Sequence, residues 1–203
     1  MTSPTPLEFD QYYHIYNRGN NGENLFFEER NYPYFLRLYA HHILPVADTY
    51  AYCLLRNHFH ALVRIRTREQ QALGVSEPGV SKPKSPSQHF GNLFNAYAKA
   101  INKAYDRTGS LFENPFGRVP VTSESHLVHL VTCIHQNPQK HGFVTDFRAW
   151  PHSSYHTVLS QQPTRLERDE VLAWYQGPAA FEEAHCHMVS DTQIAPLAPD
   201  DFD

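Results

Sequence analysis

The chain has 203 residues, of which 41% are hydrophobic and 19% are charged, a composition that excludes wholesale disorder. It contains no apolar run of membrane-spanning length and no recognisable signal peptide. The formal net charge of −4 excludes a generally basic nucleic-acid binder, so nucleic acid would have to be bound by a local basic patch. Three cysteines without CxxC spacing favour reduced thiols and a cytoplasmic location over a disulfide framework.

Hydrophobic periodicity and turn residues predict strands, helices and loops in a definite order along the chain. We expect a strand at 11–18, a helix at 28–42, strands at 49–55 and 58–66, a flexible loop at 67–87, a helix at 87–105, a short edge strand at 118–122 and a helix from 123 to about 138. This order predicts an α+β fold of the ferredoxin-like, split βαβ type, with helices packed on an antiparallel sheet.

The predicted order of elements divides the chain into two domains of unequal size. Residues 1–160 form the main domain, with its flexible loop at 67–87, and residues 161–203 form a small helical extension with an acidic tail.

Two histidines inside a predicted strand are the first candidates for chemistry. His58 and His60 are separated by one residue, so the period of two in a strand places both imidazoles on the same face. That placement suits two ligands of one metal ion. Two solvated histidines on a half-exposed strand would give the same spacing, and the spacing alone does not decide between them.

The helix after Ser123 carries an apolar stripe beside a polar one. Spacings of three and four place His126, His129, Cys133 and Asn137 on one flank, next to the apolar stripe. Such a helix would pack on a sheet and present ligands at its edge, although an ordinary solvated flank has the same pattern.

Positive charge gathers in the middle of the sequence, while acidic residues concentrate near residues 23–29 and 167–203. Residues 50–150 are therefore basic, which is the electrostatic footprint of a nucleic-acid site. The candidate DNA contacts are Arg18, Arg56, Arg118 and Lys140.

A set of ordered motifs resembles one protein family. The segment YCLLRNHFHALV at 52–63 resembles the signature of HUH single-tyrosine transposases, and it is most similar to the REP-associated tyrosine transposases. Further matching pieces are YHIYNRG at 13–19, GSLF at 109–112, CIHQNP at 133–138 and WPHSSY at 150–155. The resemblance covers about three quarters of the chain, from residue 12 to residue 155.

The resemblance implies a metal-dependent reaction on single-stranded or hairpin DNA. His58, His60 and Asn137 would hold one divalent Mg²⁺ or Mn²⁺ ion, which suits a mixed set of imidazole and oxygen ligands. In the family, a tyrosine on the late helix attacks the scissile phosphate and leaves a 5′-phosphotyrosine and a free 3′-hydroxyl. Relatives imply either a monomer or a homodimer.

The sequence departs from the family at the nucleophile. The tyrosine position, four residues before Asn137, is occupied by Cys133, whose thiol is mostly protonated at its ordinary pKa of about 8.5. One alternative is a protein that binds DNA without cleaving it. Another is a tyrosine from elsewhere, such as Tyr97, Tyr105 or Tyr155. A third is a metal-dependent phosphodiesterase that uses water, with His129 or His135 as base.

Overall fold

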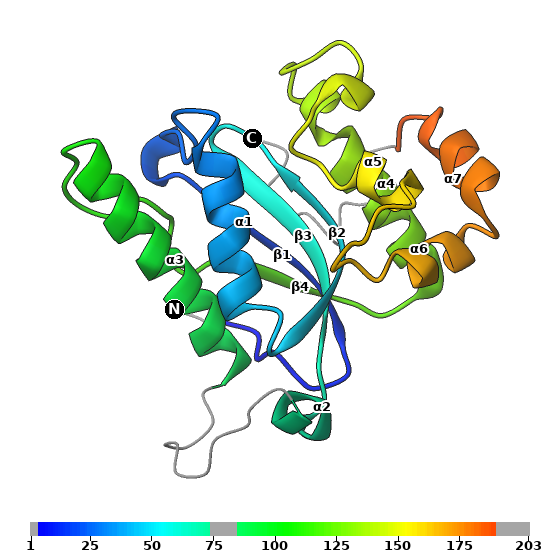
Figure 1. Cartoon of the computed structure of the whole chain (residues 1–203), viewed down its shortest axis with the longest axis horizontal. Helices are drawn as coiled ribbons and strands as arrows, with labels where there is room; N and C mark the ends of the chain where they lie inside the picture. Colours follow the sequence, from blue (N-terminus) through cyan, green and yellow to red (C-terminus); the bar gives the residue numbers. More distant parts are fainter. Residues whose placement is uncertain (1–3, 74–84, 190–203) are drawn as a thin grey trace.

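The computed structural model describes residues 4–73 and 85–189 (Figure 1). Its strands are β1 (Tyr12–Arg18), β2 (Ala47–Leu54), β3 (His58–Ile65) and β4 (Gly117–Val121). Its α-helices are α1 (Asn31–His42), α2 (Arg68–Leu73), α3 (Pro86–Ala104), α4 (Glu124–Lys140), α5 (Tyr155–Leu159), α6 (Arg168–Trp174) and α7 (Pro178–His185). Within these described ranges, none of the helices combines the length and the apolar character that crossing a membrane requires.

The four strands form one antiparallel sheet in the order β2-β3-β1-β4. This confirms the predicted ferredoxin-like α+β fold, because the two strands of the central pair come from opposite ends of the β-α-β-β unit. In the central pair, Tyr16 lies opposite His60 and His14 lies opposite Leu62. The outer strand β4 carries Pro120, which an edge strand tolerates because one side of its backbone needs no partner.

Helices α1 and α3 cover one face of the sheet (Figure 1). Alternate residues of the strands point into this layer, among them Ile15, Phe59 and Val63, which are fully buried. Helix α3 contributes Phe90 and Tyr97 to the same core. This core holds the central strands rigid without using the residues on their other face.

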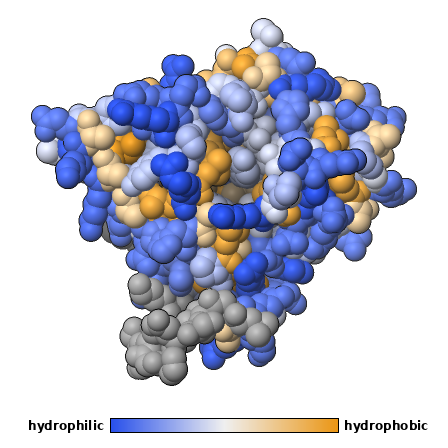
Figure 2. All heavy atoms as spheres, viewed as in Figure 1, coloured by the Kyte–Doolittle hydropathy of each residue, from blue (hydrophilic) through white to orange (hydrophobic). Residues whose placement is uncertain are grey.

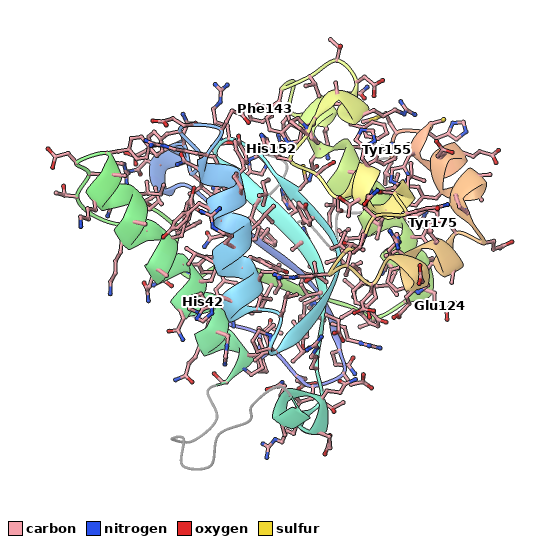
Figure 3. The ribbon with its side chains drawn as sticks, in the orientation of Figure 1. His42, Glu124, Phe143, His152, Tyr155 and Tyr175 are labelled. Carbon is pink, nitrogen blue, oxygen red and sulfur yellow. The ribbon has the colours of Figure 1, made fainter. Side chains whose placement is uncertain are left out.

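Helix α4 covers the opposite face together with α5, α6 and α7 (Figure 1). The core of this second layer includes Leu62 from β3 and Ile134 from α4. Tyr155 and Tyr175, which Figure 3 labels on this side, pack around Phe181 of α7. The strand residues that alternate with the first core therefore face α4, and these include both histidines of β3.

Two helix starts differ from the sequence prediction. Helix α2 lies inside the segment that we expected to be a loop, because Thr67 and Gln70 exchange side-chain to backbone hydrogen bonds in a capping box. Helix α3 begins at Pro86 for a similar reason, since Ser85 and Gln88 form a second capping box. The remainder of that predicted loop, residues 74–84, lies outside the described residues.

A tight turn follows β1 and fixes the end of that strand. A Cβ atom at Gly19 would overlap the carbonyl oxygen of Glu23, so only glycine fits here. The Gly19 amide donates to the carbonyl oxygen of Asn57, at a distance of 2.8 Å. This bond holds the end of β1 against the turn that leads into His58.

Candidate metal and nucleic-acid site

His58 and His60 lie together on the face of β3 that is directed toward α4, as the strand period predicted. Their ring centroids are 5.1 Å apart and nearly perpendicular. Both side chains line a hollow of about 390 Å³ at the end of the central strands. The remaining lining residues come from β1, the β2–β3 turn, the segment before β4 and the end of α4: Tyr16, Asn17, Arg18, Asn57, Phe59, Glu113, Pro115, Phe116, Gly117 and His141.

Hydrogen bonds to the Nδ1 atoms orient both imidazoles. His58 Nδ1 lies 2.8 Å from the Asn57 side-chain oxygen, which can only accept, so this nitrogen carries the proton. His60 Nδ1 lies 2.9 Å from Nε2 of His14, across the β1–β3 pair. In each ring Nε2 is the atom that would bind a metal, and a hydrogen bond at the other nitrogen is the usual support for a histidine ligand.

Burial keeps His60 neutral. The side chain is 1% exposed, and burial lowers the pKa of His60 well below its ordinary value. The proximity of His14, His141 and Lys140 lowers this pKa further, because a positive charge on His60 beside these basic groups is unfavourable. Neutral imidazole is the form that binds metals, so His60 is in the ligand form at neutral pH.

The end of α4 brings two more basic residues to this place. His141, at the C-terminal cap of α4, is exposed, and its ring centroid lies 4.8 Å from that of His58. Lys140 is close enough for its charge to act on His60. The hollow therefore has a positive end, which suits a phosphate group.

The two other predicted residues of α4 lie deeper in the protein. Asn137 is 1% exposed and Cys133 is 4% exposed. The Asn137 side-chain oxygen lies 4.0 Å from the Cys133 sulfur, and neither residue lines the hollow. In the part of the chain that the structure describes, no three His, Cys, Asp or Glu side chains gather closely enough to hold a metal ion. The predicted set is of another kind, with two imidazoles and one amide oxygen.

The four predicted DNA contacts occupy different places. Arg18 lines the hollow and pairs with Glu113 at 2.7 Å. Arg56 is exposed in the turn between β2 and β3. Arg118 is directed to the other face, where it lies 3.7 Å above the Phe116 ring and donates to the Ser87 hydroxyl at 2.8 Å. Lys140 ends α4 and does not line the hollow, so of the four predicted contacts Arg18 alone lines it.

The three tyrosines considered from the sequence serve other purposes. The hydroxyl of Tyr97 donates to the Leu25 carbonyl at 2.8 Å, and that of Tyr105 donates to the Asn31 side chain at 3.2 Å. Tyr155 is 2% exposed within the second core. The sequence reading missed Tyr16, although its signal was present: residues 14, 16 and 60 share a face by the strand period and the strand order.

His135 is also part of a structural network. Its Nε2 accepts from the Ser154 hydroxyl at 2.7 Å, and its Nδ1 donates to His185 Nε2 at 2.9 Å. His185 Nδ1 in turn donates to the Phe181 carbonyl at 2.7 Å. These bonds attach α7 to α4 and occupy both ring nitrogens of His135, so it does not face the hollow as a base.

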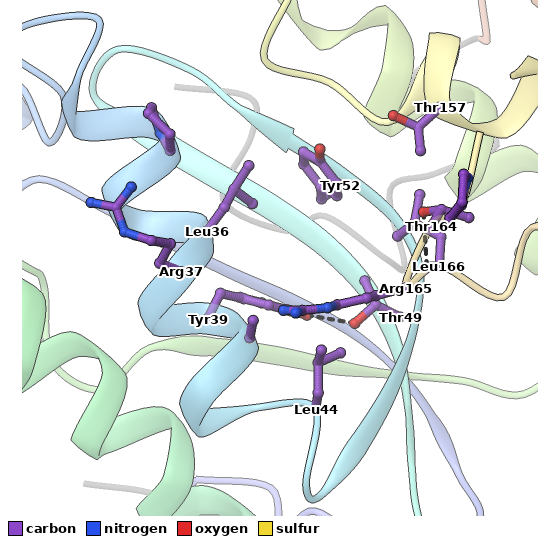
Figure 4. A pocket seen from close by; sticks show the side chains of 13 residues that line it. Leu36, Arg37, Tyr39, Leu44, Thr49, Tyr52, Thr157, Thr164, Arg165 and Leu166 are labelled. Carbon is purple, nitrogen blue, oxygen red and sulfur yellow. Dashed lines mark hydrogen bonds between the residues drawn. The ribbon is translucent and has the colours of Figure 1, made fainter.

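A larger cavity of about 560 Å³ lies elsewhere, between α1, β2 and the segment before α6 (Figure 4). Its lining includes the apolar side chains of Leu36, Leu44 and Leu166, which Figure 4 labels, and Figure 2 shows hydrophobic surface in the middle of this view of the molecule. Inside it, the Tyr39 hydroxyl and the Thr49 hydroxyl are 3.0 Å apart. No residue predicted from the sequence as a ligand or DNA contact lines it, so the smaller hollow is the candidate site.

No protein-family model matches the chain, and no curated protein matches it. Among solved structures, the chain is similar to a REP-associated tyrosine transposase bound to a REP hairpin. The TM-score is 0.58 and the identity 14%, over 80% of this chain and 88% of the other. The chain therefore shares the fold of that transposase.

Proposed function

We propose that this protein is a transposase-like DNA-processing protein that binds single-stranded or hairpin DNA at the hollow beside His58 and His60. The observation that carries the proposal is the pair of imidazoles on β3, which share one face and line a hollow with a positive end. The fold shared with the transposase supports the same conclusion, and that solved protein is bound to a DNA hairpin.

The charges at the hollow suit a phosphodiester backbone. Arg18 lies at the end of β1, and Lys140 and His141 lie at the end of α4, so positive groups from two elements surround the imidazoles. Arg56 extends this region across the β2–β3 turn. The protein would thus bind DNA locally despite its negative net charge.

The donor set fits a divalent ion of the Mg²⁺ or Mn²⁺ class. His58 and His60 would offer Nε2, because hydrogen bonds orient both rings through Nδ1. Asn137, the third ligand that the resemblance implies, is 1% exposed and does not line the hollow, so of the three predicted ligands the structure brings the two imidazoles to it. When bound, such an ion would supply charge neutralisation at the phosphate under attack. The protein itself keeps His60 neutral and places the basic side chains of Arg18 and His141 in the lining of the hollow.

Cleavage and rejoining of one DNA strand is the activity that we propose for this site. A second candidate is DNA binding without cleavage, and the position of Cys133 favours it. That thiol is 4% exposed and lies on the interior side of α4, so it does not reach a phosphate in the hollow. A reaction with water as nucleophile has less support, because His135 is occupied by Ser154 and His185.

A denaturing gel separates these functions. The protein would be incubated with Mn²⁺ and an end-labelled single strand that carries a hairpin, and a native gel would be run in parallel. A covalent protein–DNA band supports strand transfer, and retarded but uncut DNA supports the binding-only function. Cut DNA without a covalent band supports attack by water. Unbound DNA on the native gel contradicts the whole proposal.

A further inference from the structure

We propose that Tyr16 is the nucleophile that replaces the family's missing helix tyrosine. This inference rests on the proposed function, since it needs a DNA phosphate in the hollow. Among the residues that the structure describes, Tyr16 is the one tyrosine that lines the hollow with His58 and His60. It comes from β1, the strand next to the histidine strand, and not from α4.

The sheet register places Tyr16 beside the predicted metal ligands. Tyr16 lies directly opposite His60 in the β1–β3 pair. The two rings are 6.0 Å apart between centroids and nearly parallel, at 27°. The ring of His14, on the same strand face, lies 4.9 Å from that of Tyr16. The Tyr16 ring therefore forms the part of the hollow's wall that adjoins the imidazoles.

A glycine on the neighbouring strand makes room for this ring. Tyr16 lies opposite Gly117 in the β1–β4 pair. A Cβ atom at residue 117 would overlap three ring carbons of Tyr16, including Cζ, which bears the hydroxyl. The ring thus lies flat across β4, at a position that glycine alone permits. Gly117 also lines the hollow, so the ring and its support belong to one wall.

The alternative nucleophiles lie outside the lining of the hollow. Cys133 does not line the hollow, and its side chain is shorter than that of tyrosine by about a phenyl ring, whereas near-attack geometry tolerates only about an ångström of error. Tyr97 and Tyr155 are buried in the two cores. Tyr105 contacts Asn31 on the side of the molecule that α1 and α3 form.

The reaction itself is a balanced exchange of phosphodiester bonds. The phenolic oxygen of Tyr16 forms a bond to phosphorus while the bond from phosphorus to the 3′-oxygen breaks. The phenolic proton passes to water, and the departing 3′-oxygen takes a proton from water to become a 3′-hydroxyl. The product is a 5′-phosphotyrosine at residue 16, and attack by a 3′-hydroxyl reverses the step to rejoin the strand.

The test compares Tyr16→Phe with Tyr34→Phe. Tyr16→Phe removes one oxygen and keeps the ring over Gly117, so DNA retardation and Mn²⁺ binding by calorimetry should stay within about twofold of wild type. Tyr34 lies on α1, on the other face of the sheet, and serves as the matched control. We expect a covalent band for wild type and Tyr34→Phe, its loss for Tyr16→Phe, and mass-spectrometric mapping of the nucleotide to residue 16.

Other results would overturn the assignment in distinguishable ways. An adduct that persists in Tyr16→Phe, or that maps to another residue, refutes the role of Tyr16. Cut DNA without an adduct refutes it too, and so does bound DNA that stays intact with the wild-type protein. In these cases DNA binding at the hollow survives. Failure of the wild-type protein to bind DNA at all overturns the proposed function as well.

A second measurement does not depend on the reaction. With 3-fluorotyrosine at residue 16, addition of the single strand in EDTA should shift the fluorine resonance, because the base and phosphate arrive beside the ring. The same label at residue 34 should not shift. Gly117→Ala should displace the ring and reduce adduct formation at least about tenfold. An unshifted resonance at residue 16 contradicts the proposal.

Discussion

His14 and His60 are joined by a hydrogen bond of 2.9 Å between the two central strands, and both side chains are almost fully buried. The bond crosses the β1–β3 pair diagonally, since His14 lies opposite Leu62 and His60 lies opposite Tyr16. His14 is thus a support for the ring of a predicted metal ligand, and its place in the first strand separates it from His60 by more than forty residues of sequence.

Replacing His14 tests this support. We expect His14→Ala to weaken Mn²⁺ binding by about 10- to 100-fold, because the ring of His60 loses the partner that orients it. His58→Ala, which removes a ligand, should abolish binding. Isothermal titration calorimetry measures both effects, and circular dichroism checks the fold. His126→Ala, at the other end of α4, is the matched control and should bind as wild type does. Equal affinity of His14→Ala and wild type would contradict the support role.

Salt dependence tests the DNA contacts. Arg18→Ala and Arg56→Ala should each weaken binding of a fluorescent hairpin and reduce the slope of log K against log salt by about one, because each removes one phosphate contact. Arg118→Ala should have a smaller effect, since Arg118 is engaged with Phe116 and Ser87 on the other face. Anisotropy titrations at several salt concentrations give the slopes.

The control for these arginines is Arg165→Ala. Arg165 is equally exposed but lines the larger cavity away from the histidines. Its removal lowers the net charge by the same amount and should leave the slope unchanged. A slope that responds equally to all four arginines would show that binding is diffuse and not centred on the hollow.

The thiol of Cys133 should be dispensable for any cleavage. Cys133→Ser keeps the size of the side chain but removes the sulfur, and we expect an unchanged covalent band on the denaturing gel because this residue does not line the hollow. Cys133→Tyr, in contrast, places a ring in a position that is 4% exposed and should lower the stability by about 1–3 kcal/mol through overpacking. Loss of the band in Cys133→Ser would make the thiol the nucleophile after all.

Acid should loosen the attachment of α7 to α4. Burial lowers the pKa of His185 from its ordinary 6.5 to about 4, and burial also lowers the pKa of His135. Between pH 6.5 and 4 these histidines are protonated in the unfolded chain but neutral in the folded chain. The free energy of unfolding therefore falls as the pH drops through this range. For His185 alone the loss approaches about 3 kcal/mol. Urea unfolding at pH 7 and pH 5 measures it.

Two variants test whether His185 causes this pH dependence of the stability. His185→Gln should flatten the pH dependence, because the group that resists protonation is gone. His187→Gln changes an exposed histidine two residues away and should leave the dependence as in wild type. If His185→Gln and wild type lose stability in parallel, the buried histidine pair is not the cause.

The order of strands and helices could be predicted from the sequence because each element has a clear period. The alternation of His58, Phe59 and His60 also placed both imidazoles on one face. The caps at Thr67 and Ser85 were missed because a threonine or serine with a glutamine three residues later was not read as a capping box. The sequence also places His14 on the first strand beside the predicted site, whereas Tyr16, two residues along on the same strand face, was not singled out.

The burial of Cys133 and Asn137 could not be predicted from the spacing of residues in α4. That spacing is equally typical of a solvated flank and of a flank that presents ligands at the edge of the sheet. Both residues are buried, and Cys133 lies near Cys53 of β2, so this flank is turned toward the sheet. The C-terminal helices instead contact a neighbouring side of α4, through Thr132, His135 and Gln136.

Gln136 connects the C-terminal segment to the last turns of α4. Its side-chain amide donates to the carbonyl oxygens of His185 and His187, and its oxygen accepts from the amide of Val189 at 3.0 Å. Helix α4 therefore packs against the sheet on one side and is hydrogen-bonded to the last described stretch of chain on the other. Its axial position, and with it the distance from Lys140 to the β3 imidazoles, is set jointly by the sheet and by this C-terminal strap. Substitutions in α7 should thus be read as changes to the spacing of the site, even though none of its residues enters the hollow.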